Sequence, residues 1–471
     1  MGETSLTRSS KALYFSLLSL LFFLLLQSAS GRELKFVILI YRHGDRTPIE
    51  NYPNSLYNES TWPQGFGQLT KIGMRQQYEL GQYIKKRYSN FLSAAYEREE
   101  ILIKSSETDR TIMSAQANLA GMYPPAGDQI WNPELLWQPI PVHVVPKASN
   151  PRLRFPIFEC PRYKELLHET MTSTEYQVKI QPYKKFLGKM AFYSGYDSRT
   201  LRYMDNFKIW HVQDTLFCES IHNYTLPPWA TKEVRSKLSE LTELSLSSLF
   251  GVYKREEKAR LQGGLLVKSI LSSLSKAAHF PKKRKMLIYS AHDTTLGALQ
   301  MALNTYNGRL PPYASCQMFE LYQDNNGQHT IEMYFRNDTS KEPYPQTLPG
   351  CSSVCPLSNF EQLVLPILID DWANECERTE KKKGTYSQSD MILETSENPD
   401  MDTEDEGPVA STEVPKSTEI PETEKPESET PGPTTTTAVP ESTSDMEIAY
   451  SPARASQPTT HKPTTQDSYL G

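Results

Sequence analysis

Two arginines flank a histidine near the start of the chain. Arg42, His43 and Arg46 lie in the segment Tyr-Arg-His-Gly-Asp-Arg-Thr-Pro at 41–48, directly after the apolar run 36–40. Such a run predicts a buried strand, and in open α/β sheets ligands bind where strands end. Arginine forks match the oxygens of a phosphate group, and a neutral imidazole can attack phosphorus. The segment therefore predicts a phosphate site with a histidine nucleophile.

Two later strand ends carry side chains of matching chemistry. The run 285–293 ends in His292 and Asp293, and the run 101–111 delivers Arg110 just beyond a second strand. Because ligands bind at the edge where parallel strands end, we expect these side chains to share one site with the first segment. Phosphoryl transfer depends mostly on positioning and charge stabilisation, which such a set can provide.

Strands and helices alternate through the body of the chain, residues 32–376. The expected strands are Lys35–Tyr41, Ile101–Ser105, Met286–Ser290, Gln317–Gln323 and Thr330–Arg336, with an extended stretch at Trp137–Val145. The expected helices are Gly67–Leu92, Thr108–Met122, Lys232–Phe250, Glu256–Ala278 and Asp293–Leu303. This alternation predicts an α/β sheet that helices cover on both faces. The mostly helical stretch 152–250 would be an inserted cap over the site.

The N-terminus has the features of a targeting segment. Arg8 and Lys11 precede the apolar run Leu13–Leu26, and small residues follow it. This pattern predicts a signal peptide over residues 1–31. An uncleaved membrane anchor is the alternative, but the run is short for a bilayer.

The composition changes after Cys376. Residues 377–471 are rich in Thr, Ser, Pro and Glu, and they hold 20 acidic and 8 basic side chains. Such a segment cannot bury enough surface to offset its chain entropy, so we expect a disordered, mucin-like tail. The segment has no apolar run near its end, so we expect neither a membrane helix nor a GPI signal there. The rest of the chain is mildly basic, which suits an anionic substrate and is too weak a bias to indicate nucleic acid.

The chain holds an even number of cysteines behind the expected signal peptide, which indicates disulfides. They are Cys160, Cys218, Cys316, Cys351, Cys355 and Cys376. Cys351 and Cys355 follow a Pro-Gly turn and are expected to pair with each other. No second Cys/His pair stands at the spacing of a zinc site, and the residues alone do not pair the other four cysteines. Glycosylation sequons at Asn58, Asn223 and Asn337 fit a secretory route.

The Arg-His-Gly-x-Arg-x-Pro signature, together with the distant His-Asp, resembles the histidine acid phosphatases over nearly all of residues 33–376. Stretches beginning at Trp62, Trp137 and Pro312 are similar to the vertebrate prostatic and lysosomal members of that family. The resemblance implies a phosphoglycerate-mutase-like sheet, no metal or other cofactor, and a homodimer. It also implies the disulfides Cys160–Cys376 and Cys218–Cys316.

The resemblance assigns roles to the six candidate site residues. His43 would be the nucleophile that forms a phosphohistidine, and Asp293 the general acid. Arg42, Arg46, Arg110 and His292 would bind the phosphate. Asp293 also has a plainer reading as a helix N-cap, and both roles can hold together. His143 and His222 are expected to be structural.

The sequence therefore predicts a secreted, glycosylated acid phosphatase that hydrolyses phosphate monoesters. A phosphoprotein, lysophospholipid or nucleotide substrate remains open, as does the lysosomal lumen as location, although the lysosomal relative carries a membrane span that this sequence does not predict. Two other readings are a mutase-like phosphoryl transferase and a non-catalytic secreted glycoprotein on a phosphatase scaffold.

Overall fold

The computed structural model describes residues 31–146, 152–153, 159–197, 201, 208–280 and 282–377. Nearly all of the expected signal peptide and of the expected tail, and parts of the cap insertion, lie outside the described residues. Among the residues described, no helix is both long and apolar enough to cross a bilayer.

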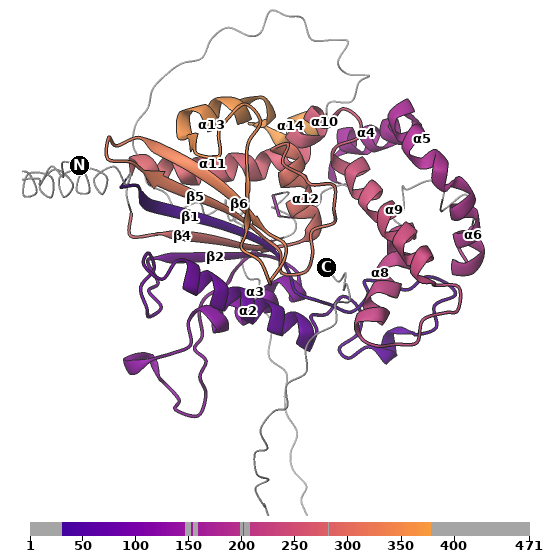
Figure 1. Ribbon diagram of the computed structural model, residues 1–471, viewed down its shortest axis with the longest axis horizontal. Coiled ribbons are helices and arrows are strands. Elements are labelled where there is room, and N and C mark those ends of the chain that lie inside the picture. Colours follow the sequence, from indigo (N-terminus) through magenta and orange to yellow (C-terminus); the bar gives the residue numbers. More distant parts are fainter. Residues whose placement is uncertain are drawn as a thin grey trace, which may run out of the picture. The chain divides into compact units, whose positions relative to one another are not determined.

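One mixed sheet runs through the body (Figure 1). Its strands are β1 (Glu33–Arg42), β2 (Ile101–Ser106), β3 (His143–Val145), β4 (Met286–Ala291), β5 (Cys316–Gln323), β6 (His329–Arg336), β7 (Tyr344–Gln346) and β8 (Cys355–Pro356). Their order is β3-β2-β4-β1-β5-β6-β7, with β8 paired to β6. The strands β3, β2, β4 and β1 are parallel, and from β1 to β7 the pairing is antiparallel. β1 therefore stands where the two halves of the sheet meet.

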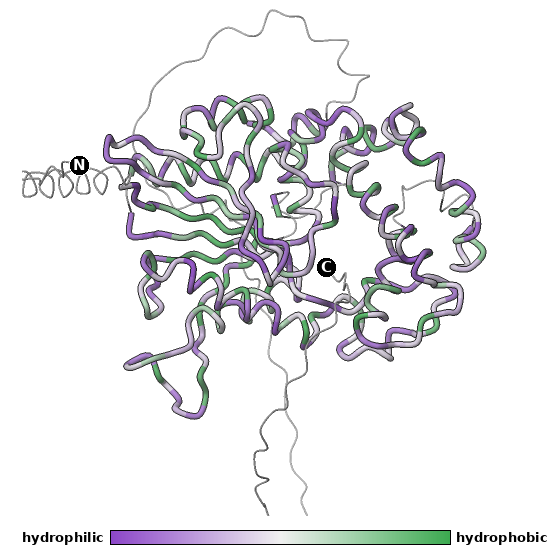
Figure 2. The backbone as a smooth tube through the Cα atoms, viewed as in Figure 1, coloured by the Kyte–Doolittle hydropathy of each residue, from purple (hydrophilic) through white to green (hydrophobic). Residues whose placement is uncertain are grey.

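Helices cover both faces of the sheet, as the sequence predicts. One face carries α2 (Lys71–Arg87) and α3 (Asp109–Met122), and the other carries α11 (Leu265–His279), α12 (Asp293–Ala302) and α13 (Leu357–Val364). Successive side chains of β1 point to opposite faces, so Ile38 joins the core under α11 and α12 while Leu39 joins the core under α2 and α3. Figure 2 shows the resulting apolar layer along the strands.

The helix expected over Gly67–Leu92 is shorter in the structure. α2 begins after Thr70, whose hydroxyl accepts a hydrogen bond from the Gly73 amide at 3.1 Å. Residues before Thr70 instead lie along the signature segment, where Leu69 forms a β-bridge with Arg46. The chain there positions the candidate site rather than extending the helix.

A group of helices between β3 and β4 forms the cap (Figure 1). They are α4 (Pro161–Thr172), α5 (Thr174–Ile180), α6 (Lys184–Ser194), α8 (Lys208–Ile221) and α9 (Lys232–Phe250). The cap helices share an apolar cluster that includes Leu216 and Leu241. The remaining short elements are η1 (Glu59–Thr61), η2 (Gly127–Gln129), η5 (Gln181–Tyr183), η8 (Leu365–Ile367) and α14 (Trp372–Glu377).

The single helix expected over Glu256–Ala278 is interrupted. It consists of α10 (Arg255–Ala259), a π-helical turn η7 (Arg260–Gly264) and α11. A Cβ at Gly263 would lie 2.6 Å from the carbonyl oxygen of Ala298, and one at Gly264 would lie 2.2 Å from that of Ile367. The two glycines therefore let this turn approach neighbouring backbone that larger residues would push away.

Two of the three expected disulfides are present, Cys160–Cys376 and Cys351–Cys355. The Cys218–Cys316 pairing is wrong for this structure, because both side chains are buried free thiols. The Cys218 Sγ donates to the Arg46 carbonyl oxygen at 3.3 Å, whereas the Cys316 Sγ faces the carbonyl oxygen of its neighbour Gln317 at 3.7 Å. Each thiol is thus turned toward a different acceptor.

Candidate active site

The signature segment leaves the C-terminal end of β1 and is held between two neighbouring strands. The His43 amide donates to the Ala291 carbonyl oxygen at the end of β4, and the His43 carbonyl oxygen accepts from the Ala314 amide before β5. The ends of β4 and β2 bring in the other predicted residues. All six candidates, Arg42, His43, Arg46, Arg110, His292 and Asp293, therefore come from three adjacent strand ends, as the sequence predicts.

His43 is buried, with 1% of its surface exposed. Its Nδ1 lies 2.8 Å from the Gly44 carbonyl oxygen. A carbonyl oxygen can only accept, so the Nδ1 carries the proton and the Nε2 keeps its lone pair. The Nε2 is therefore the nitrogen available to attack an electrophile.

The surroundings also keep His43 neutral. Burial lowers the pKa of His43 well below its usual value, and the positive charges of Arg110, Arg42 and Arg46 lower it further. The ring of His292 lies 5.7 Å from that of His43, and burial together with Arg110 lowers the pKa of His292 to about 3. Both imidazoles are thus uncharged in mildly acidic solution.

Each arginine of the signature is held by a buried carboxylate. An Arg42 Nη2 lies 2.7 Å from Asp293 Oδ2, and an Arg46 Nη1 lies 2.8 Å from Asp214 Oδ2. Arg42 also donates to a backbone carbonyl oxygen, and its guanidinium carbon lies 4.2 Å from the centre of the Tyr313 ring. These contacts fix the two guanidiniums in place.

The three candidate arginines nevertheless keep unused donors. The Nε atoms of Arg42, Arg46 and Arg110 are all buried without a hydrogen-bond partner. Burial and the charge of Arg46 lower the pKa of Arg110 to about 10, because the charges of Asp293 and Asp214 offset them only in part. Buried donors are normally satisfied, so the arrangement fits an anion that accepts from them.

Asp293 stands at the first turn of α12 and has 8% of its surface exposed. Its Oδ1 accepts a hydrogen bond from the Thr294 amide at 2.7 Å. Burial alone would raise the pKa of Asp293, but the charges of Arg42 and Arg46 outweigh that effect and hold the pKa below its usual value. His292 occupies the N-cap position itself, and its Nε2 lies 2.9 Å from the Ser106 Oγ.

Two glycines allow the signature segment to lie directly on α2. A Cβ at Gly44 would come within 2.3 Å of the Gly73 carbonyl oxygen, and a Cβ at Gly73 would come within 2.1 Å of the Asp45 carbonyl oxygen. The Gly44 amide also donates a hydrogen bond to the Ser114 Oγ at 3.1 Å. The glycine of the signature is thus required by a close backbone approach.

Sequence reasoning missed several residues that hold the site. Asp214 has no local motif, because it lies in an ordinary amphipathic helix of the cap, α8. Tyr313 falls within one of the stretches that carry the family resemblance, which could have marked it. Asp45 and His222 form a further pair, with the His222 Nε2 2.8 Å from Asp45 Oδ2.

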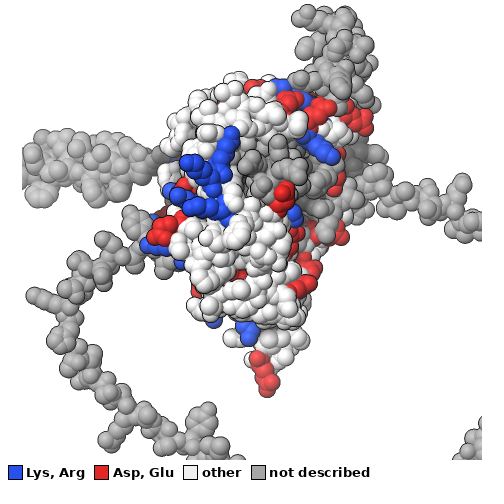
Figure 3. Space-filling model, turned by 90° about the vertical axis from the view of Figure 1, so that its right-hand side faces the viewer, with Lys and Arg blue, Asp and Glu red and all other residues white. Residues whose placement is uncertain are grey.

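The other expectations concern the surface and metals. His143 is exposed in the edge strand β3. The sequon residues Asn58 and Asn223 are exposed and Asn337 is half-buried. Among the described residues, no group of His, Cys, Asp or Glu side chains is arranged to hold a metal ion. On the cap face seen in Figure 3, Lys and Arg side chains gather in one area.

Comparisons with known proteins identify the family of the chain. The family model of the histidine phosphatase superfamily (branch 2) matches residues 33–336. Human prostatic acid phosphatase is 52% identical over 380 residues, covering 80% of this chain and 97% of that protein. Lysosomal acid phosphatase of Xenopus laevis is 51% identical over 365 residues, covering 77% and 83%. A solved Hafnia alvei phytase in complex with myo-inositol hexakis sulphate shares the fold, with a TM-score of 0.55 at 16% identity over 75% of this chain and 100% of that one. The chain therefore belongs to the histidine phosphatase superfamily, branch 2.

Proposed function

We propose that this protein is an acid phosphatase that hydrolyses phosphate monoesters through a phosphohistidine on His43. The observation that carries the proposal is the group of three arginines with unused buried donors around a neutral imidazole. A phosphate dianion would accept from these donors and relieve the repulsion between Arg46 and Arg110. The names of the acid phosphatases that it resembles support the same activity.

The reaction has two displacements at phosphorus. The lone pair of the His43 Nε2 forms a P–N bond while the ester P–O bond breaks, and Asp293 gives its proton to the departing oxygen. In the second step water attacks phosphorus, the P–N bond breaks, and Asp293 takes the proton from water. Arg42, Arg46 and Arg110 stabilise the phosphoryl oxygens in both steps.

Acidic working conditions follow from the opposite demands on His43 and Asp293. The nucleophile must be neutral, and burial together with the neighbouring arginines lowers the pKa of His43, which favours the neutral ring in acidic solution. The general acid must be protonated, but the charges of Arg42 and Arg46 hold the pKa of Asp293 below its usual value. A bound phosphate dianion would take up those arginine charges, so the pKa of Asp293 should rise when substrate binds.

Rapid quenching in alkaline denaturant during turnover of a ³²P-labelled monoester tests the proposal. We expect label on His43, stable in alkali and labile in acid, and its loss in His43→Ala together with a fall in kcat of at least about 10³-fold. Label on a different residue, or a His43→Ala variant with substantial turnover, would contradict the assignment. Release of phosphate to water rather than to an added alcohol separates a phosphatase from a mutase-like transferase.

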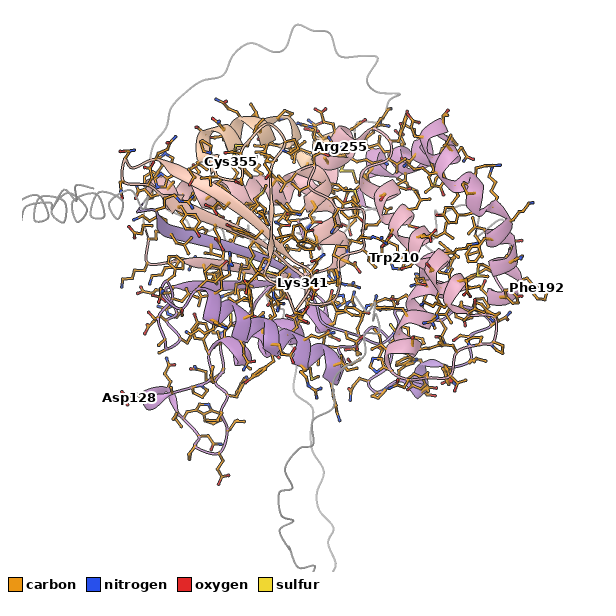
Figure 4. All side chains as sticks on the ribbon, in the orientation of Figure 1. Asp128, Phe192, Trp210, Arg255, Lys341 and Cys355 are labelled. Carbon is orange, nitrogen blue, oxygen red and sulfur yellow. A yellow bond between two sulfur atoms is a disulfide. The ribbon has the colours of Figure 1, made fainter. Side chains whose placement is uncertain are left out.

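A homodimer is the assembly that we propose, through the segment between α3 and β3. This segment projects from the body, as Figure 4 shows at the labelled Asp128. It exposes large apolar side chains close to the edge strand β3, namely Ile130, Trp131, Leu135, Leu136 and Trp137. Exposed apolar patches of this kind are typical of interfaces. Light scattering should give twice the chain mass, and Leu136→Asp should yield a monomer of unchanged thermal stability; a wild-type monomer would refute the dimer.

The secretory route and glycosylation complete the proposal. Two disulfides join parts of the described body, which favours an oxidising compartment. Asn58 and Asn223 are exposed enough to carry glycans. Expression in mammalian cells should give secreted protein whose mass falls on treatment with an N-glycosidase, whereas retention of unglycosylated protein in the cytosol would contradict the route. The substrate would be the phosphate monoester of a phosphoprotein, a lysophospholipid or a nucleotide.

A further inference from the structure

Asp45 is the one carboxylate of the signature segment, and the proposed reaction does not use it. It is fully buried, with 0% of its surface exposed. One of its oxygens, Oδ2, accepts hydrogen bonds from the Thr70 hydroxyl and from the His222 Nε2, whereas Oδ1 has no partner. A buried carboxylate that is only partly satisfied is unfavourable for stability. Its presence between His43 and Arg46 calls for a functional reason.

The peptide unit that joins Gly44 to Asp45 connects this carboxylate to the nucleophile. The carbonyl oxygen of that unit accepts the hydrogen bond from the His43 Nδ1 at 2.8 Å. The amide of the same unit donates to the Gln76 Oε1 at 2.8 Å. The orientation of this one peptide plane therefore sets both the tautomer and the direction of the His43 ring.

His222 fixes the Asp45 side chain from the cap. It directly follows α8, and its ring is packed against the indole of Trp62, with ring centres 5.6 Å apart at 88°. The side chain of His222 is 20% exposed, and its Nε2 lies 2.8 Å from Oδ2 of the fully buried Asp45. The same helix also supplies Asp214, which holds Arg46. The cap thus contacts two neighbouring residues of the signature segment, Asp45 and Arg46.

We infer that Asp45 and His222 are positioning residues that hold the Gly44–Asp45 peptide so that the His43 Nε2 points at phosphorus. This inference rests on the proposed role of His43. If it holds, the position of α8 affects the first chemical step in two ways: through Asp214, which pairs with Arg46, and through His222, which pairs with Asp45. Small misplacements of a reacting group reduce rates by about 10²-fold, so the effect is measurable.

Two substitutions of matched polarity isolate the hydrogen bond. The amide nitrogen of Gln in His222→Gln can reach about as far as the His222 Nε2, whereas that of Asn in His222→Asn ends one bond short. Lys208→Met is the control, because Lys208 stands at the other end of α8 and its 2.9 Å ion pair with Glu50 does not touch the Gly44–Asp45 peptide.

Quenched-flow measurement of phosphoenzyme formation, with the burst amplitude counting intact sites, gives the readout. We expect His222→Asn to slow formation about 10–100-fold, His222→Gln to stay within about 3-fold of the wild type, and Lys208→Met to match it. Inhibition by inorganic phosphate should change less than about 2-fold in all three variants, because the arginines stay in place. His222→Asn with a wild-type rate, equal losses in Asn and Gln, an equal loss in Lys208→Met, or a loss of phosphate affinity as large as the loss of rate would each overturn the inference.

The proposed function can fail separately. If the wild-type protein carries no label on His43, the nucleophile is wrong and the reaction must be reassigned. If the wild type is labelled on His43 and the His222 variants are labelled at the same rate, the reaction stands and the positioning role falls.

Discussion

Replacing Asp293 with asparagine should separate the two roles that this residue can have. The variant keeps the oxygen that accepts from the Thr294 amide but cannot give a proton to a leaving group. A positioned general acid contributes about 10²–10⁴-fold, or about 3–5 kcal/mol of transition-state free energy. We expect the lower half of that range, because Arg42 at 2.7 Å opposes protonation of the carboxyl in wild-type protein.

The assay compares kcat for alkyl phosphates, whose leaving groups need a proton, with kcat for p-nitrophenyl phosphate, whose leaving group does not. Asp293→Asn should reduce the first by about 10²–10³-fold and the second by less than about 10-fold. Inorganic phosphate should inhibit at least as well as before, since Arg42 is released from its carboxylate.

Asp214→Asn is the matched control for the loss of a carboxylate beside an arginine. It removes the charge that faces Arg46 at 2.8 Å, so it should reduce turnover of both ester classes alike and lower stability by about 2–4 kcal/mol. An equal loss on both ester classes in Asp293→Asn would refute the general-acid reasoning and leave Asp293 as a partner of Arg42 and a helix-start residue.

Three further outcomes follow from the packing. Glu219 is buried, neither of its carboxylate oxygens has a hydrogen-bond partner, and burial raises its pKa to about 7. The folded state therefore holds a proton that the unfolded chain loses above pH 4.5. Urea unfolding should show the free energy of unfolding falling by about 1–3 kcal/mol between pH 4.5 and 7.5, and Glu219→Gln should flatten that slope. Replacing both Cys160 and Cys376 with serine should lower stability by about 2–5 kcal/mol in the same assay. Gly44→Ala should abolish turnover in a folded protein, because its Cβ would lie 2.3 Å from the Gly73 carbonyl oxygen; circular dichroism and phosphate release check both parts.

The strand ends could be predicted from the sequence because apolar runs and their exits are local features. β1, β2 and β4 end within one residue of the expected positions, and the general geometry of parallel strands then brings Arg46, Arg110 and His292 to one edge. The arrangement of the site follows from this topology, without knowledge of any side-chain contact.

Features that depend on distant packing could not be predicted in the same way. The residues at 255–279 have a helical pattern, which does not reveal the π-helical turn or the close approach of Gly263 to the backbone of α12. Asp214 pairs with Arg46 across 168 positions of sequence, and nothing in its own helix marks it. The free thiols of Cys218 and Cys316 likewise depend on how α8 sits against the signature segment, which spacing does not reveal.

The unneutralised charge of Arg110 beside Arg46 links the stability of the protein to the product of its proposed reaction. The two guanidiniums repel each other, and ions that bind the folded state alone raise its unfolding free energy with concentration. Inorganic phosphate should therefore protect the fold and block turnover through the same contacts. A phosphate-rich fluid would preserve the protein in a resting form, and dilution into a phosphate-poor one would release activity while making the chain easier to unfold.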